Sequence, residues 1–291
     1  MILRGVVSSL AIALAASVAT AAAPLPFFYD LYTFRQDART TTVVAAVAVP
    51  AGGLQRERVD ARVRYRFDVR FVLADTVERV VSRSLDSVFV SMAQGLPSQH
   101  LLHTNVEIEA PPSTGTVQRI VVTDATRPGV GQLFQTPFPI PDYSGTDLML
   151  SDIAFGLPDA TSGWTRRGHT IALLPTSQFP ESAFNVYYEI YNLPFGRSYE
   201  TEIAIQPIDD PEDEAETVRT RFTSESTAGA DDSLGELRRV ESALPTGQYR
   251  VTVTVRDLIT GRVASTSRTI RVRGWRRGMT LVPAFSRVPE P

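Results

Sequence analysis

The stretch Gln248-Tyr-Arg-Val-Thr-Val-Thr-Val255 decides the fold class of this chain of 291 residues. Its apolar side chains alternate with Arg and Thr, so one face of the segment is apolar and the other is polar. This period of two is typical of strands in antiparallel sheets with one buried face. The same alternation occurs in Arg66-Phe-Asp-Val-Arg-Phe-Val-Leu73. The sequence therefore predicts an all-β chain, with at most a turn or two of helix in residues 232–242.

Further strands are expected wherever apolar runs are separated by Gly, Pro, Asp and Ser. Seven more segments fit this description: 43–49, 101–108, 117–123, 170–174, 199–208, 218–222 and 264–272. The number and spacing of these segments are typical of β-sandwiches.

The segments repeat along the chain, which indicates two similar units. Phe67-Asp-Val-Arg-Phe is echoed by Phe184-Asn-Val-Tyr-Tyr, and Val122-Thr-Asp with Gly129 is echoed by Val255-Arg-Asp with Gly261. Prolines at 137, 139 and 141 form a stiff link between the units. We therefore expect two tandem immunoglobulin-like or fibronectin-like sandwich domains, residues 24–141 and 142–275, and a C-terminal tail, residues 276–291.

One corner of the second unit carries an immunoglobulin-like signature. In such sandwiches a Tyr before a core strand often hydrogen-bonds back to the backbone. Tyr249 follows Leu244-Pro-Thr-Gly-Gln and occupies this place. After the strand, Asp257-Leu-Ile-Thr-Gly261 predicts a hairpin loop with Gly in the left-handed conformation.

The first residues predict export. Arg4 precedes an apolar, Ala-rich run, residues 5–23, and Ala19-Thr-Ala21 offers a cleavage site. Residues 1–23 are therefore expected to be a signal peptide, and the protein to be secreted or periplasmic. The alternative is an uncleaved membrane anchor. After cleavage we expect no membrane span.

Composition excludes several kinds of function. The net charge of −3 gives no overall positive field for nucleic acid, so no nucleic-acid partner is expected. Cysteine is absent, which excludes disulfides, thiolate metal sites and a Cys nucleophile. No glycine-rich phosphate loop and no G-x-S-x-G occurs. We expect no cofactor.

The tyrosines of residues 184–193 are the candidate site. In one strand, Tyr188 shares a face with apolar neighbours and belongs to the core, whereas Tyr187, Glu189 and Tyr191 share the opposite face. This second face is either an interface with the first domain or a partner, or a ligand surface on which a sugar stacks. Intramolecular or partner packing is favoured, with Glu189 keeping access to water or to an Arg.

Other candidate groups are weaker. His100 and His103 enter a strand on opposite faces, and His169 is isolated, so no metal or catalytic site is assigned to them. The acidic run 209–216 lacks the ordered spacing of a Ca²⁺ loop, and residues 142–147 favour a turn. Residues 271–277 form a basic patch with a Trp and are read as a charged edge strand.

The chain resembles the β-sandwich region of bacterial proteins named for a GWxTD motif. Three stretches carry the resemblance: Leu148-Met-Leu-Ser-Asp-Ile-Ala-Phe-Gly156, Phe184-Asn-Val-Tyr-Tyr-Glu-Ile-Tyr-Asn-Leu193, and Leu244-Pro-Thr-Gly-Gln-Tyr249 with Asp257 and Gly261. It extends more weakly over residues 28–141. The motif itself is absent, since Gly163-Trp-Thr-Arg-Arg167 and Gly274-Trp-Arg276 share only its first two letters. The resemblance implies the fold and export, and no chemistry.

Taken together, the sequence predicts an exported, non-catalytic protein that acts as a binding or structural module of the cell envelope. Its partner would be an envelope protein or a polysaccharide. The alternative is a carbohydrate-active or other hydrolytic enzyme on a β scaffold, because carboxylate pairs meet in space and leave no fixed spacing in a sequence.

Overall fold

The computed structural model describes residues 24–75, 79–158, 162–179, 183–208, 217–229, 231–241, 244–272 and 281–283. Within these residues the regular structure is β-strand, apart from one short 3-10 turn, η1(Ala51–Gly53). The chain is all-β, as its sequence predicts. Residues 232–242 were expected to hold a helical turn, and this was wrong: β17(Ser233–Glu241) is a strand.

Two sheets form the N-terminal sandwich. One contains β1(Phe28–Arg35), β2(Thr41–Pro50) and β6(Leu101–Ala110), in the order β1-β2-β6. The other contains β3(Glu57–Val59), β4(Arg62–Asp75), β5(Val80–Met92), β7(Thr116–Asp124) and β8(Gly131–Pro137). In this sheet β4 pairs with β5 and β7, and β7 pairs with β8, all antiparallel.

Two further sheets form the C-terminal sandwich. One contains β9(Met149–Leu150), β10(Ala154–Leu157), β11(Trp164–Arg166), β12(His169–Leu173), β14(Ala183–Tyr191) and β17. The other contains β13(Gln178–Phe179), β15(Ser198–Pro207), β16(Val218–Glu225), β18(Gly247–Asp257) and β19(Val263–Val272). Near the C-terminus, β20(Leu281–Pro283) pairs in parallel with β6, so the chain returns to the N-terminal sandwich.

The two sandwiches share one strand order, which is immunoglobulin-like. The order β1-β2-β6 in the first corresponds to β10-β14-β17 in the second, and β5-β4-β7-β8 corresponds to β16-β15-β18-β19. The predicted tyrosine corner is confirmed, because the hydroxyl of Tyr249 donates to the carbonyl of Pro245 at 2.9 Å. Gly261 has the expected left-handed backbone, with φ of 73°.

One of the two sequence echoes joins equivalent positions and the other does not. Asp124 ends β7 and Asp257 ends β18, and both buried carboxylates accept backbone N–H groups of the following turn. The echo of Phe67 and Phe184 was wrong, since β4 and β14 occupy different places in the fold. A period of two reports that one face is buried, and it does not report which strand of the sandwich is present.

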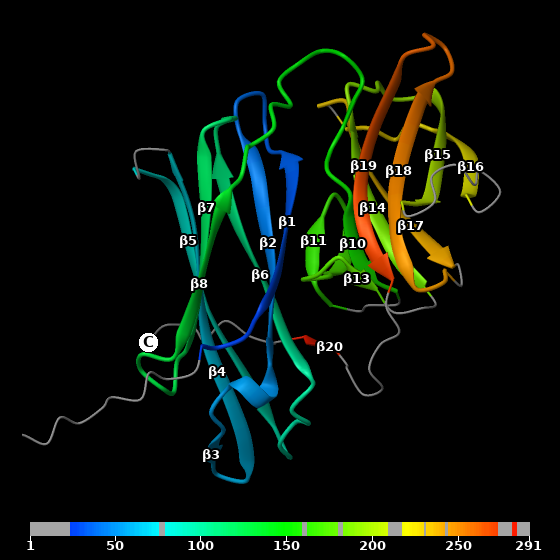
Figure 1. Ribbon diagram of the computed structural model, residues 1–291. Helices are drawn as coiled ribbons and strands as arrows, with labels where there is room; N and C mark the ends of the chain where they lie inside the picture. Colours follow the sequence, from blue (N-terminus) through cyan, green and yellow to red (C-terminus); the bar gives the residue numbers. More distant parts are fainter. Residues whose placement is uncertain are drawn as a thin grey trace, which may run out of the picture.

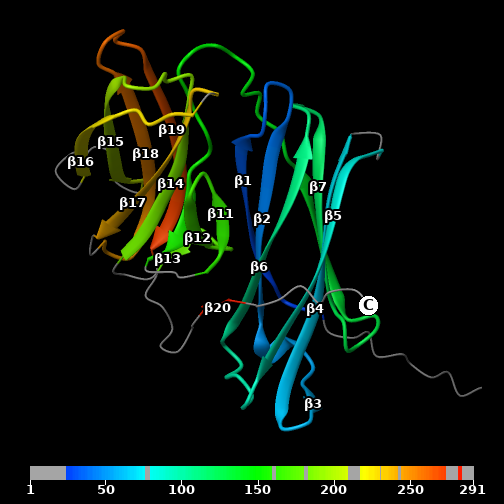
Figure 2. The same cartoon turned by 180° about the vertical axis from the view of Figure 1, so that it is seen from behind.

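The four sheets stack in layers, with the β1-β2-β6 sheet against the β10-β12-β14 sheet in the middle (Figures 1 and 2). Each sandwich has its own hydrophobic core. A third buried cluster lies between the two middle sheets and contains Tyr32, Phe34, Val44, Ala46, Ala154, Trp164, Ile171, Leu173 and Tyr187. We call this contact and its polar surroundings the joint.

Separate expression of the two sandwiches, cut between Pro141 and Asp147, is expected to give two proteins with β-sheet circular dichroism. Each retains its own core, but each exposes its half of the joint and should therefore unfold at lower denaturant concentration than the full chain. An unfolded second half beside a stable full chain would show that the sandwiches share one cooperative core.

Candidate functional site: the joint between the sandwiches

Aromatic rings form the centre of the joint. In β1, Tyr32 and Phe34 point away from the N-terminal core and toward the other sandwich. The Phe34 ring lies 5.0 Å from Trp164 and 5.7 Å from Tyr187, and Trp164 meets Tyr187 edge-on at 5.7 Å. Such pairs add about 0.5–1.5 kcal/mol each beyond the area they bury. The outer face of β14 is therefore as closely packed as its inner face.

A buried carboxylate lies beside these rings. Glu189 is fully buried, and the hydroxyls of Tyr187 and Tyr191 donate to its two oxygens at 2.8 and 2.9 Å. The guanidinium of Arg166 approaches Oε1 at 2.5 Å, and that of Arg167 approaches Oε2 at 3.2 Å. We call these five residues the Glu189 cluster. Both carboxylate oxygens have charged and neutral donors, which is what makes a buried charge tolerable.

A tight hairpin brings the two arginines to Glu189. β11 and β12 are joined by Arg167 and Gly168, whose φ angles of 45° and 80° are those of a type I′ turn. Before β11, Gly163 has φ of 151°, and a Cβ there would lie 2.3 Å from the carbonyl oxygen of Ile171. Only glycine fits at this place, so the local sequence fixes where β11 begins.

The Glu189 cluster also forms hydrogen bonds with the N-terminal sandwich. The hydroxyl of Tyr191 accepts the backbone N–H of Arg35 at 2.7 Å, and Arg166 donates to the carbonyl of Arg35 at 2.7 Å. The guanidinium of Arg35 lies over the Tyr191 ring and bonds Asn192 at 2.9 Å. Through these contacts, the end of β1 is held by three residues of the other sandwich.

Burial and charge keep the tyrosines and the arginines of the cluster in one protonation state. Burial, together with the nearby charge of Glu189, raises the pKa of Tyr187 and Tyr191, so both phenols stay protonated and act as donors. Burial alone would lower the pKa of Arg166, but the charge of Glu189 and the hydrogen bond to it, together with the nearby tyrosines, outweigh burial and raise that pKa. The two tyrosines and the two arginines of the cluster therefore do not titrate near neutral pH.

A second ionic contact crosses the joint at β19. Arg268 pairs with Asp30 of β1 and, at 2.7 Å, with Asp152, and its guanidinium lies 4.4 Å from the centre of the Tyr32 ring. It also donates to the carbonyl of Leu31 at 2.9 Å. Burial raises the pKa of Asp30 and Asp152, and the charge of Arg268 partly offsets this.

The substitution Arg268→Met is expected to lower the free energy of unfolding by about 2 kcal/mol at neutral pH, because it leaves two carboxylates half-buried without a cation. Their pKa values then rise further. When folding raises the pKa of a carboxyl group, the folded protein loses stability as the pH rises through that pKa. The difference from the wild type should therefore be smaller at about pH 4 than at pH 7. Urea unfolding at both pH values tests this, with Arg256→Met as the exposed control; a pH-independent difference would contradict it.

The structure places all three predicted site residues in the joint. Tyr187, Glu189 and Tyr191 are fully buried, so they form no surface that is open to a ligand in this structure. Of the two surroundings expected for Glu189, the structure shows contact with arginine, from Arg166 and Arg167, and no exposure to water. Tyr188 lies in the C-terminal core.

Sequence reasoning missed the residues that complete the site. Trp164, Arg166 and Arg167 were noted only as a departure from the GWxTD motif, and Arg268 was not singled out. The one available signal was the Arg-Gly pair at 167 and 168, which predicts a tight hairpin between two short strands. It does not reveal which strand the hairpin covers.

His103 and His169 lie in different surroundings. His103 lies in β6, and burial lowers its pKa to about 4, so it is neutral at physiological pH. Nε2 of His169 lies 3.1 Å from the carbonyl of Gly235. Among the described residues no three His, Asp or Glu side chains gather as metal ligands do. In the same part of the chain no helix is long and apolar enough to cross a membrane.

Several predicted features fall wholly or partly outside the described residues. These are the signal peptide 1–23, the acidic run 209–216, and most of the basic patch 271–277 and of the tail 276–291. Residues 142–147 form an irregular connection with a bend at 146–147, in which Asp142 accepts the backbone N–H of Ser144 at 2.9 Å. Tyr143 of this connection is buried and packs on Tyr191.

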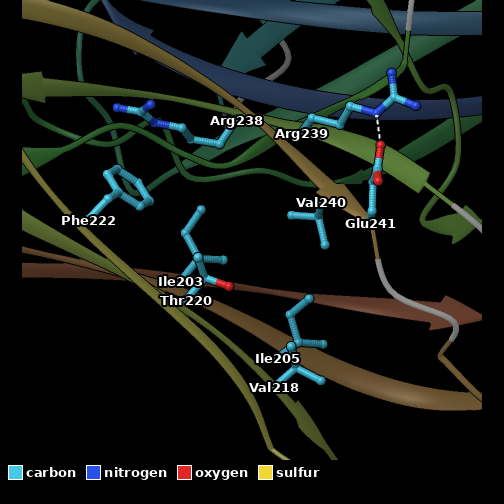
Figure 3. A pocket seen from close by; sticks show the side chains of 9 residues that line it. All are labelled: Ile203, Ile205, Val218, Thr220, Phe222, Arg238, Arg239, Val240 and Glu241. Atoms are coloured by element: carbon cyan, nitrogen blue, oxygen red, sulfur yellow. Dashed lines mark ion pairs between the residues drawn. The ribbon is translucent and has the colours of Figure 1, made fainter.

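A groove of about 300 Å³ lies between β16 and β17, at the open side of the C-terminal sandwich (Figure 3). Its lining is Ile203, Ile205, Val218, Thr220, Phe222, Arg238, Arg239, Val240 and Glu241. Arg238 covers the Phe222 ring at 4.1 Å, and Arg239 pairs with Glu241 at 2.6 Å. Glu241 is the single carboxylate of this lining, whereas glycoside hydrolysis generally needs two.

Comparisons with known proteins leave the function open. No protein-family model and no curated protein matches the chain. Matches among solved structures include red sea bream transglutaminase, at 10% identity and a TM-score of 0.24, and a β-glucuronidase of Bacteroides uniformis, at 11% and 0.29. They cover 84% and 82% of this chain but only 31% and 28% of those chains. The chain thus spans less than a third of their length, and such distant likeness carries no argument about function.

Proposed function

We propose that the protein is an exported, non-catalytic β-sandwich module that binds or scaffolds at the cell envelope. The joint is the observation that carries this proposal. The joint uses Glu189, the tyrosines around it and the arginines that neutralise it to fix one sandwich against the other. In other proteins these residue types often bind ligands or take part in catalysis. A rigid pair of sandwiches suits a protein that presents surfaces at a fixed spacing.

Binding without turnover is the expected behaviour of the purified chain from residue 22 onward. Cosedimentation with isolated envelope fragments measures binding, and a screen of polysaccharide, ester and peptide substrates measures turnover. Robust turnover that is lost on a single Asp or Glu substitution would favour the hydrolytic enzyme and overturn the proposal.

Export is tested by expressing the full chain in a Gram-negative host. We expect the mature protein in the periplasm or medium, with cleavage after Ala21 of the Ala19-Thr-Ala21 site. Mass spectrometry of the purified protein locates its first residue. An intact N-terminus in the membrane fraction would show that residues 1–23 act as an anchor instead. The relation to the GWxTD-motif proteins is likewise a proposal, supported by the three matching stretches.

A further inference from the structure

The outer face of the β5-β4-β7-β8 sheet lies on the far side of the N-terminal sandwich from the joint (Figures 1 and 2). Strand alternation places the core residues on its inner side and every second residue on its outer side. We call this outer surface the arginine–leucine face. It consists of Arg62, Arg64, Arg66, Asp68, Arg70 and Val72 of β4, Arg83, Leu85, Ser87 and Phe89 of β5, Val117, Arg119, Val121 and Thr123 of β7, and Leu133 and Gln135 of β8.

The face is basic although the whole chain has a net charge of −3. Its arginines outnumber its carboxylates, which are Asp68 and, at its edge beside Arg64, Glu57. The carboxylate of Asp68 accepts a hydrogen bond from the hydroxyl of Ser87 at 2.8 Å. Arg66, Arg70 and Arg83 are exposed to solvent. Guanidinium groups on a flat surface can each bond a carboxylate with two parallel N–H groups, so the face is complementary to an acidic surface.

A row of three apolar residues and one arginine crosses the middle of this basic face. Cross-strand pairing sets Leu85, Arg70, Val121 and Leu133 side by side. Leu85 is 60% exposed and Leu133 is 55% exposed. These two exposed leucines, with Val121 next to Leu133 and Val72 next to Arg70 along β4, place apolar side chains among the arginines at the middle of the face.

The equivalent row of the C-terminal sandwich shows that the fold does not require these apolar side chains. Val121 precedes Asp124 by three residues, as Thr254 precedes Asp257, so the matching row is Arg221, Glu202, Thr254 and Ser265. There the side chains satisfy one another: Arg221 pairs with Glu202, and the hydroxyls of Thr254 and Ser265 are 3.1 Å apart. The same strand order is built with polar residues, so it does not require leucines at these positions.

We propose that the arginine–leucine face docks an acidic protein, whose contact surface sets carboxylates around an apolar centre. This rests on the proposed function as a binding module and names its partner class. Interface centres are enriched in apolar side chains and in Arg, which is the composition of this face. A glycan would instead be expected to meet a concave site or an exposed aromatic platform, and the ring of this face, Phe89, is half-buried under Arg64.

The test uses labelled polymers of defined chemistry: a random copolymer of glutamate and leucine, poly-glutamate, and polygalacturonate. The full chain should bind the Glu–Leu copolymer most tightly, by fluorescence anisotropy, and binding should weaken as salt is raised. Arg70→Glu with Arg83→Glu should weaken binding at least about tenfold, since two charge-assisted contacts become repulsive. Leu85→Ser with Leu133→Ser should reduce copolymer binding to the level of poly-glutamate.

The matched control is Arg219→Glu with Arg250→Glu, which makes the same charge change at exposed positions on the corresponding sheet of the C-terminal sandwich. It should leave binding unchanged. Equal losses from both double variants, or no loss from Arg70→Glu with Arg83→Glu, would overturn the proposal. Polygalacturonate binding as tightly as the copolymer would overturn it in favour of an acidic glycan, and face-dependent self-association in sedimentation would overturn it in favour of a second copy. If envelope binding persists in Arg70→Glu with Arg83→Glu, the proposed function stands and the face alone is wrong.

Discussion

The substitution Glu189→Gln is expected to lower the free energy of unfolding by about 3–5 kcal/mol, the usual cost of removing one partner from a buried ion pair. The amide keeps the shape of the side chain, but its one oxygen can replace only one of the two acceptors that Tyr187 and Tyr191 now use. It leaves Arg166 and Arg167 with a positive charge and no buried counter-ion, however, and that uncompensated charge is the source of the loss. Chemical denaturation at neutral pH measures it.

A double-mutant cycle separates this charge effect from a packing effect. Arg166→Met alone should destabilise the protein, because Glu189 then has less compensation. Combined with Glu189→Gln it should cost clearly less than the sum of the two single changes, because the same ion pair is counted once. Additive losses would show that the two residues act independently. A loss below about 1 kcal/mol for Glu189→Gln would show that water reaches the cluster in solution.

Local patterns in the sequence were sufficient for much of the fold. The alternation in residues 248–255 reports a buried face directly, because a strand that is half in water must alternate. The corner at Tyr249 and the left-handed Gly261 are set by neighbours in the chain, and both were predicted correctly. The strand β17 was missed because Glu236 and Arg238, which face inward at the open side of the sandwich, hide the apolar alternation.

The sequence favoured packing of the outer face of β14, but it could not show how completely that face is buried, for a physical reason. On the outer face of β14 the presence of Glu189 between two tyrosines suggested contact with water. Glu189 can be buried there because Arg166 and Arg167, more than 20 residues earlier, reach the carboxylate through a separate hairpin. A charged residue in a sequence indicates a solvent-exposed position only as long as no partner for its charge is known, because an unpaired charge is costly to bury. Once a partner is supplied, the adjoining rings of Tyr187 and Tyr191 read as interface residues.

The second large effect concerns the two adjacent tyrosines, which lie on opposite faces of β14. The sequence placed Tyr188 in the core and Tyr187 on the opposite face of the strand. Because both rings are fully buried, each substitution is now expected to cost about 3–5 kcal/mol, the range for truncating a large buried aromatic side chain. Urea unfolding compares them, with Phe195→Ala as the control. Phe195 is 75% exposed, so its truncation should change stability by no more than about 0.5 kcal/mol.

The two losses should differ in where the structure opens. Tyr188 lies within the C-terminal core, so Tyr188→Ala should lower the stability of that sandwich without freeing the connection at residues 142–147. Tyr187 packs on Phe34 of the other sandwich, so Tyr187→Ala should loosen the joint first and speed proteolytic cleavage in this connection. Limited proteolysis under native conditions distinguishes the two. Equal cleavage rates for the two variants would show that the joint and the C-terminal core open as one unit, and a wild-type stability for Tyr187→Ala would show that the joint is open in solution.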